Sequence, residues 1–179
     1  MDTRPTGQVA LLIDFENLVR GTSDQDSVDC EILFRLAEEH GRVLVANAYA
    51  DWRMKDVNKY QAALYRLGVD LVHVFGKFGS TGFKNAVDVK MAVDAIGAVA
   101  ALPHINTFVI VSGDRDFIHV LKALRQHGKI VVGVSPASST SDDFAALCDR
   151  FVRYEALAAA YAPPPTTGER EDTSVVFAI

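Results

Sequence analysis

The sequence has few of the residues that build cross-linked or thiolate-metal sites. Only two of its 179 residues are cysteines, Cys30 and Cys148, and each lies in an apolar pattern with helical spacing. This usage predicts reduced thiols and argues against a disulfide-stabilised secreted scaffold. The five histidines are scattered, without the close spacing of zinc ligands. We therefore expect neither a disulfide nor a zinc site.

Long hydrophobic runs are also missing. No apolar run approaches the roughly 20 residues that span a bilayer, and the first residues, MDTRPTGQ, lack the pattern of a signal peptide. We therefore expect a cytoplasmic protein with no membrane partner. The composition predicts one globular domain over residues 1–161, followed by a Pro-rich tail or linker over residues 162–179.

Positive charge is in short supply overall, because the formal net charge is −5. This balance argues against broad, non-specific nucleic-acid binding. The charge is uneven, however, since residues 53–90 hold seven Lys or Arg against three acids. The basic segment is compatible with a solvated helix face or with phosphate contacts, and the sequence leaves both open.

Strand-like and helix-like segments alternate along the whole chain. Parallel strands joined by helices produce this pattern, and strands that are apolar throughout are typical of a sheet covered on both faces. We predict an α/β three-layer sandwich with a five-stranded parallel sheet, order 3-2-1-4-5, and helices on both faces. The strands are expected at residues 8–15, 43–50, 69–76, 107–112 and 129–136, and the helices at 28–41, 56–68, 87–101, 116–128 and 141–161.

Carboxylates follow the strands that this order makes neighbours. The first strand ends at Asp14, the fourth runs through IVSG into Asp114 and Asp116, and Asp88 begins the helix before the fourth strand. Each acid alone is compatible with capping or charging a helix N-terminus. Together, at one rim of a parallel sheet, the four would repel one another unless cations neutralise them. All-oxygen ligands select hard ions, so the cluster predicts Mg²⁺ or Mn²⁺.

Four further polar residues are expected near the same rim in secondary roles. Asn17 follows the first strand, Asp51 the second, and Ser112 the fourth. Asp94 is six residues beyond Asp88, about 9 Å along a helix axis, which makes it a poorer ligand candidate.

These segments resemble a known family when they are taken together. DFEN, AYADW, KNAVDVKMAVDA and VIVSGDRDF followed by LRQHGKIVVGV are similar to the NYN domain, a branch of the PIN-like nuclease superfamily, and within it to the bacterial LabA-like group. The resemblance covers about residues 8–155. It implies a metal-dependent ribonuclease, with Asp14, Asp88, Asp114 and Asp116 as the catalytic and metal-binding set. It also implies supporting roles for Asn17, Asp51 and Asp94.

An RNA partner would need basic and aromatic residues beside the rim. The candidates for phosphate contacts are Arg53, Lys55, Lys77, Lys84 and Arg115. Trp52 and Phe83 are candidates for stacking on single-stranded bases, with a core role equally open for Trp52. The tail is compatible with a second RNA-binding domain or protein, and the oligomeric state, monomer or homodimer, stays open.

Three other classes compete with this interpretation. A haloacid dehalogenase-like phosphohydrolase would have Asp where the chain has Glu16, and a late acid pair spaced by four rather than two. A receiver-like domain would have Lys after the fifth strand, where the chain has SPASS. A non-catalytic RNA-binding or scaffold module, with the acids in structural roles, stays open.

Overall fold

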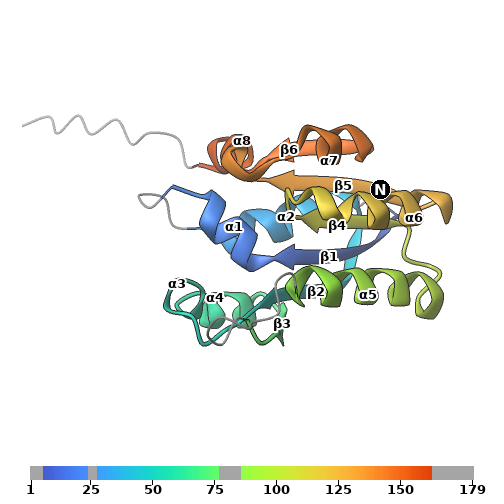
Figure 1. The fold of residues 1–179 in the computed structure, drawn as a ribbon. Helices are drawn as coiled ribbons and strands as arrows, with labels where there is room; N and C mark the ends of the chain where they lie inside the picture. Colours follow the sequence, from blue (N-terminus) through green and yellow to red (C-terminus); the bar gives the residue numbers. More distant parts are fainter. Residues whose placement is uncertain (1–5, 24–27, 77–85, 163–179) are drawn as a thin grey trace, which may run out of the picture.

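A six-stranded parallel sheet forms the centre of the molecule. The computed structural model describes residues 6–23, 28–76 and 86–162. The strands are ordered β3-β2-β1-β4-β5-β6, with helices on both faces (Figure 1). Their bounds are β1 Gln8–Asp14, β2 Arg42–Ala50, β3 Asp70–His73, β4 Thr107–Val111, β5 Ile130–Ser135 and β6 Arg150–Arg153. The predicted α/β class, parallel sheet and strand order are therefore confirmed.

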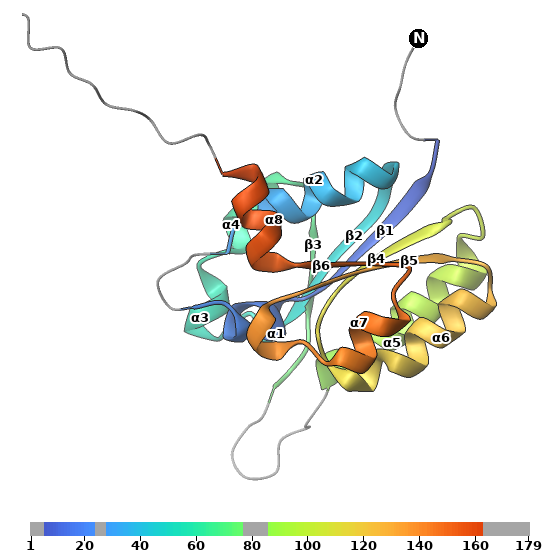
Figure 2. The same cartoon turned by 90° about the horizontal axis from the view of Figure 1, so that it is seen from above.

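The helices divide into two groups, which Figure 2 shows on opposite sides of the sheet. One face carries α1 Phe15–Gly21, α2 Cys30–His40, α3 Lys55–Asn58, α4 Gln61–Arg66 and α8 Tyr154–Tyr161. The other carries α5 Ala86–Ala101, α6 Ile118–Gln126 and α7 Asp142–Leu147. Two short 3₁₀ helices, η2 Arg115–Phe117 and η3 Ala137–Ser139, follow β4 and β5.

The central strand β1 supplies side chains to both halves of the core. Val9, Leu11 and Ile13 face the first group of helices, whereas Ala10 and Leu12 face the second. Successive side chains of a strand point to opposite faces, so a strand covered on both sides must be apolar throughout. β1 is therefore fixed between β2 and β4, and the position of its last residue is fixed with it.

The structure corrects the predicted strand count from five to six. Residues 141–161, predicted as one helix, form α7, β6 and α8. Without β6, the open edge of β5 would leave backbone groups without partners. Asp149 begins the pairing, because its N–H donates to Val131 O at 2.9 Å and its carboxylate accepts from Val131 N at 2.8 Å. The β-forming residues Phe151 and Val152 then lie beside β5.

The remaining differences concern helices. The predicted helix over residues 56–68 is divided into α3 and α4, and the short helix α1 directly after β1 was not predicted. Both cysteines are free thiols, as expected, and burial raises the pKa of each to about 12. Across residues 6–23, 28–76 and 86–162, none of the helices is long and apolar enough to cross a membrane.

Candidate active site

Asp14 ends β1 as a buried carboxylate. Its side chain caps α1, because Oδ1 accepts a hydrogen bond from the backbone N–H of Asn17 at 2.9 Å. Only 4% of Asp14 is exposed. The cap uses one carboxylate oxygen, so the simple capping role and a role in a site are compatible.

Ser112 connects the end of β1 to the end of β4. Its buried hydroxyl donates to Asp14 Oδ2 at 3.5 Å and accepts from the N–H of Asp114 at 3.2 Å. Asp114 in turn caps η2, because its Oδ1 accepts from Asp116 N at 2.8 Å. One chain of hydrogen bonds therefore fixes three of the four predicted acids relative to one another.

Asn17 holds the turn that carries Asp114. Its side-chain oxygen accepts from Gly113 N at 3.3 Å and from Ser139 Oγ at 3.2 Å. The turn has no room for a side chain at Gly113, since a Cβ there would lie 2.2 Å from Ser135 Oγ and 2.3 Å from Ser139 O. The amide of Asn17 thus positions the turn.

Asp88 approaches this group from the first turn of α5. It is half-buried, and it lies close enough to Asp14 for its charge to raise the pKa of that carboxyl. Burial, with the nearby charges of Asp114 and Asp116, raises the pKa of Asp88 to about 6. Burial raises the pKa of Asp14 to about 7, against the lowering effect of the Asn17 N–H. The structure therefore brings the four predicted acids into one electrostatically coupled group.

Glu16 is an acid for which the sequence interpretation gave no role at the site. Its charge raises the pKa of both Asp14 and Asp88. Its own carboxylate pairs with Arg20 at 2.5 Å and accepts from Asp51 N at 2.9 Å. The sequence signal that could have indicated a role for Glu16 is its position two residues after Asp14, with only the buried Phe15 between them.

Asp51 and Asp94 have partners of their own. Arg53 donates two hydrogen bonds to the Asp51 carboxylate, at 2.8 and 2.5 Å, and holds the pKa of Asp51 well below its usual range. Asp94 accepts from the hydroxyl of buried Tyr49 at 3.0 Å and pairs with Lys90 at 2.5 Å. Both carboxylates thus have a basic side chain as an ion-pair partner.

The basic candidates lie on two sides of the acids. Arg53 and Lys55 are exposed after β2, and Arg115 is exposed after β4, where it pairs with Asp143 at 3.0 Å. Lys77, Lys84 and Phe83 lie outside the described residues. Trp52 is buried against Phe15 and donates its indole N–H to Val72 O at 3.1 Å, so it belongs to the core.

The chemistry of this group fits a hard divalent cation. Within the described ranges, none of the four acids forms an ion pair with Lys, Arg or His, and Arg20 acts on Asp14 only as a more distant charge. Carboxylate oxygens are the ligands that Mg²⁺ and Mn²⁺ prefer. In those ranges no three His, Cys, Asp or Glu side chains are close enough together to hold a metal ion as they stand. The donor types therefore fit, while their spacing is wider than a coordination sphere.

A parallel sheet of this order, with acids after β1 and β4, is typical of the PIN-like nuclease class. Within that class, the NYN domain family matches residues 8–155, and the chain belongs to this family.

Two similar proteins have no described activity. The uncharacterized protein MJ0482 of Methanocaldococcus jannaschii is 29% identical over 136 residues, which are 75% of this chain and 50% of that protein. The chain thus spans about half the length of this relative. The crystal structure of a protein of unknown function, VPA0982 from Vibrio parahaemolyticus, matches with a TM-score of 0.69 and 23% identity, over 86% of this chain and 96% of that one. This second likeness concerns the fold alone.

Proposed function

We propose that the protein is a ribonuclease dependent on Mg²⁺ or Mn²⁺ that hydrolyses phosphodiester bonds of single-stranded RNA in the cytoplasm. The observation that carries the proposal is the burial of Asp14 close to the charge of Asp88. Two neighbouring carboxylates, withdrawn from water and without a cationic partner among the described residues, are unfavourable for the protein alone. A site that receives a cation accounts for this cost.

The four acids have distinct roles in this proposal. Asp14, Asp88 and Asp114 would hold the cation, and Asp116, more exposed at the edge, would hold a second ion or orient water. When bound, the divalent ion supplies positive charge for the scissile phosphate and lowers the pKa of water so that hydroxide is available at neutral pH. Hydrolysis then leaves a 3′-hydroxyl and a 5′-phosphate.

Neighbouring residues fix this arrangement and guide the strand. Ser112 and Asn17 position Asp14 and the turn of Asp114 through the hydrogen bonds described above. Arg53 and Lys55 on one side, and Arg115 on the other, can contact phosphates that flank the scissile bond.

Cleavage of an end-labelled single-stranded RNA tests the proposal. We expect cleavage by the unchanged protein with Mg²⁺ or Mn²⁺ but not with EDTA. Asp14→Asn keeps the shape of the side chain and an acceptor for Asn17 N, and should reduce the rate at least about 100-fold. Asp70→Asn, an exposed acid at the start of β3, is the matched control and should cleave normally.

A non-catalytic RNA-binding module is the second candidate. The wide spacing of the carboxylates favours it. RNA that binds without being cleaved, with an affinity that does not depend on metal, would replace the ribonuclease proposal by this one.

A further inference from the structure

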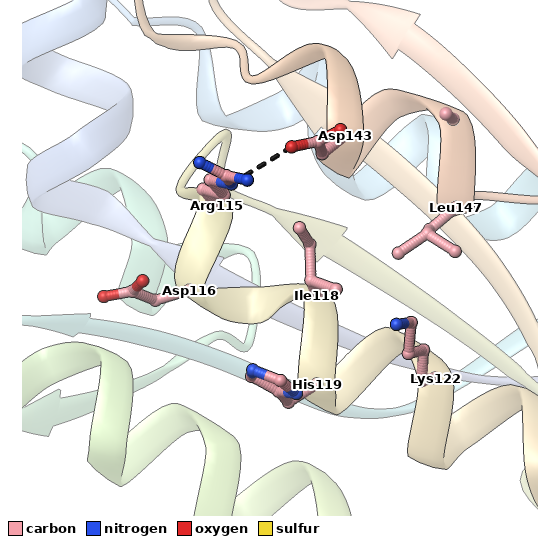
Figure 3. Close-up of a pocket in the computed structure, with 8 residues that line it drawn as sticks. Arg115, Asp116, Ile118, His119, Lys122, Asp143 and Leu147 are labelled. Carbon is pink, nitrogen blue, oxygen red and sulfur yellow. Dashed lines mark ion pairs between the residues drawn. The ribbon is translucent and has the colours of Figure 1, made fainter.

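An open hollow of about 690 Å³ lies next to the acids, between η2, α6 and α7 (Figure 3). Its volume is within the range of about 300–1,000 Å³ that small-ligand sites occupy. Asp116 lines one end of the hollow and also raises the pKa of Asp88 by its charge. The hollow therefore shares Asp116 with the candidate active site.

One wall of the hollow carries basic side chains. Arg115 of η2 lines it together with His119 and Lys122 of α6, and these last two, three residues apart, lie on one face of that helix. His119 and Lys122 are exposed, and among the described residues Lys122 forms no ion pair. This wall can thus offer charge to an anion.

Arg115 reaches toward the opposite side, where the dashed line in Figure 3 joins it to Asp143 of α7. The two side chains are 75% and 58% exposed. Exposed pairs of this kind contribute little to stability, whereas a guanidinium binds phosphate in a two-pronged geometry. A phosphate group can therefore replace the Asp143 carboxylate at little cost to the fold.

The rest of the lining is apolar. Ile118 of α6, with Ala146 and Leu147 of α7, contributes hydrocarbon surface. A ribose or the face of a base can lie against such a surface while its phosphate meets the basic wall. Figure 3 shows Asp116 and Lys122 on opposite sides of the hollow, so the Asp116 charge disfavours a phosphate on its own side and leaves the Lys122 side for it.

We propose that this hollow binds one nucleotide of the RNA strand, next to the scissile phosphate, with one phosphate on Lys122, the adjoining phosphate on Arg115, and the ribose and base against Ile118, Ala146 and Leu147. The inference rests on the proposed function for the identity of the strand. The proposed site is new relative to the sequence interpretation, which had predicted an RNA contact for only one of its residues, Arg115.

Binding of a labelled single-stranded RNA of about ten nucleotides tests this site separately from cleavage. Fluorescence anisotropy would be measured in Mg²⁺ with the full chain carrying Asp14→Asn, alone and combined with Lys122→Glu or Ala146→Trp. Lys122→Glu reverses a charge on the wall, and Ala146→Trp fills the hollow without changing charge. Arg42→Glu is the matched control, because Arg42 is exposed at the start of β2, at the opposite end of the strands.

We expect Lys122→Glu to raise the Kd at least about fivefold at low salt and to reduce the salt dependence, in log–log slope, by about 0.7 for one lost phosphate contact. Ala146→Trp should raise the Kd with the slope unchanged, and Arg42→Glu should do neither. If the unchanged protein cleaves RNA while both variants bind like Arg42→Glu, the hollow is not a nucleotide site and the ribonuclease proposal stands. If both variants lose affinity and the unchanged protein does not cleave RNA, the hollow is a nucleotide site and the proposal of hydrolysis fails.

Discussion

Asp14 is the residue in which structure and function conflict most directly. A carboxylate that is 4% exposed pays a desolvation cost that its two hydrogen-bond donors, Asn17 N and Ser112 Oγ, offset only in part. Sites that hold charge for function are often costly to the fold in this way. This desolvation cost can be measured as a pH-dependent change in the free energy of unfolding, without knowledge of the substrate.

Without metal, Asp14→Asn should stabilise the protein at pH 8. The pKa of Asp14 is raised from 3.8 to about 7 in the folded protein. The folded state therefore holds a proton that the unfolded chain has lost, and the free energy of unfolding falls as the pH rises between these values. Removing the charge should recover up to about 4 kcal/mol at pH 8 and little at pH 4, measured by urea unfolding in EDTA.

Asp70→Asn, at an exposed position, is the control for that experiment and should change stability by less than about 0.5 kcal/mol at either pH. A destabilised Asp14→Asn at pH 8 would show that the Asp14 carboxylate is favourable to the fold, and the argument for a cation at this position would lose its basis.

The position of the four acids could be predicted from the sequence because three of them follow strands and the fourth, Asp88, begins a helix that starts at the same edge of the sheet. Asp14, Asp114 and Asp116 follow apolar runs, and residues after parallel strands share one edge of the sheet. The engagement of Asp51 by Arg53 could not be predicted, since it depends on how the side chain turns in a loop. The bond from Tyr49 to Asp94 joins residues 45 positions apart and required the packing of α5 on β2.

At the scale of elements, the turn between β4 and η2 determines whether Asp114 faces Asp14. The turn is held from three directions: by Asn17, by Ser112, and by the loop after β5, where Ser141 N donates to Gly113 O at 3.0 Å. Such a turn tolerates little displacement, because each contact is at hydrogen-bond distance.

Gly113→Ala should displace the turn. Its Cβ would meet Ser139 O at 2.3 Å, and a backbone atom cannot move aside as a flexible side chain can. We expect a loss of about 1–3 kcal/mol in unfolding free energy and a fall in RNA cleavage, measured by thermal unfolding and by the cleavage assay.

Gly97→Ala in α5 is the matched substitution. A Cβ at Gly97 has nothing within 4 Å, so alanine should stabilise the helix by up to about 1 kcal/mol and leave cleavage unchanged. Equal behaviour of the two variants would mean that the turn has room to adapt.

The sequence predicted the long elements better than the short ones. The observed bounds of α2 and α5 lie within two residues of the predicted ranges. β6 has only four residues, between two helical segments, and local periodicity favoured helix through them. The decisive factor was the open edge of β5, which is known only once the sheet is assembled.

At the scale of the molecule, divalent cations should stabilise the fold in a pH-dependent way. The pKa values of about 7 and 6 for Asp14 and Asp88 mean that both are protonated at pH 5 and charged at pH 8. A ligand that binds the folded state but not the unfolded chain raises the free energy of unfolding, by about 2.7 kcal/mol when its concentration is 100 times its Kd. For a chain of 179 residues this corresponds to a rise in Tm of roughly 5–10 °C.

We therefore expect Mg²⁺ or Mn²⁺ to raise the Tm at pH 8 by several degrees and at pH 5 by little. The Asp14→Asn variant should respond weakly at both pH values. A Tm that rises equally in the variant and the unchanged protein would place the cation elsewhere on the surface.

The central place of β1 has a consequence for how the chain matures. β1 is formed from the first residues of the domain, yet its partner β4 lies far along the chain, with Leu12 opposite Ile110. Pairings over such separations are slow to form, since the intervening chain must first be ordered. During synthesis, Asp14 thus emerges well before Asp88 and Asp114, and we expect no partial chain to assemble the group of acids. A nascent or truncated form would have the first carboxylate without its companions, so the proposed hydrolytic activity would require the whole sheet to have assembled.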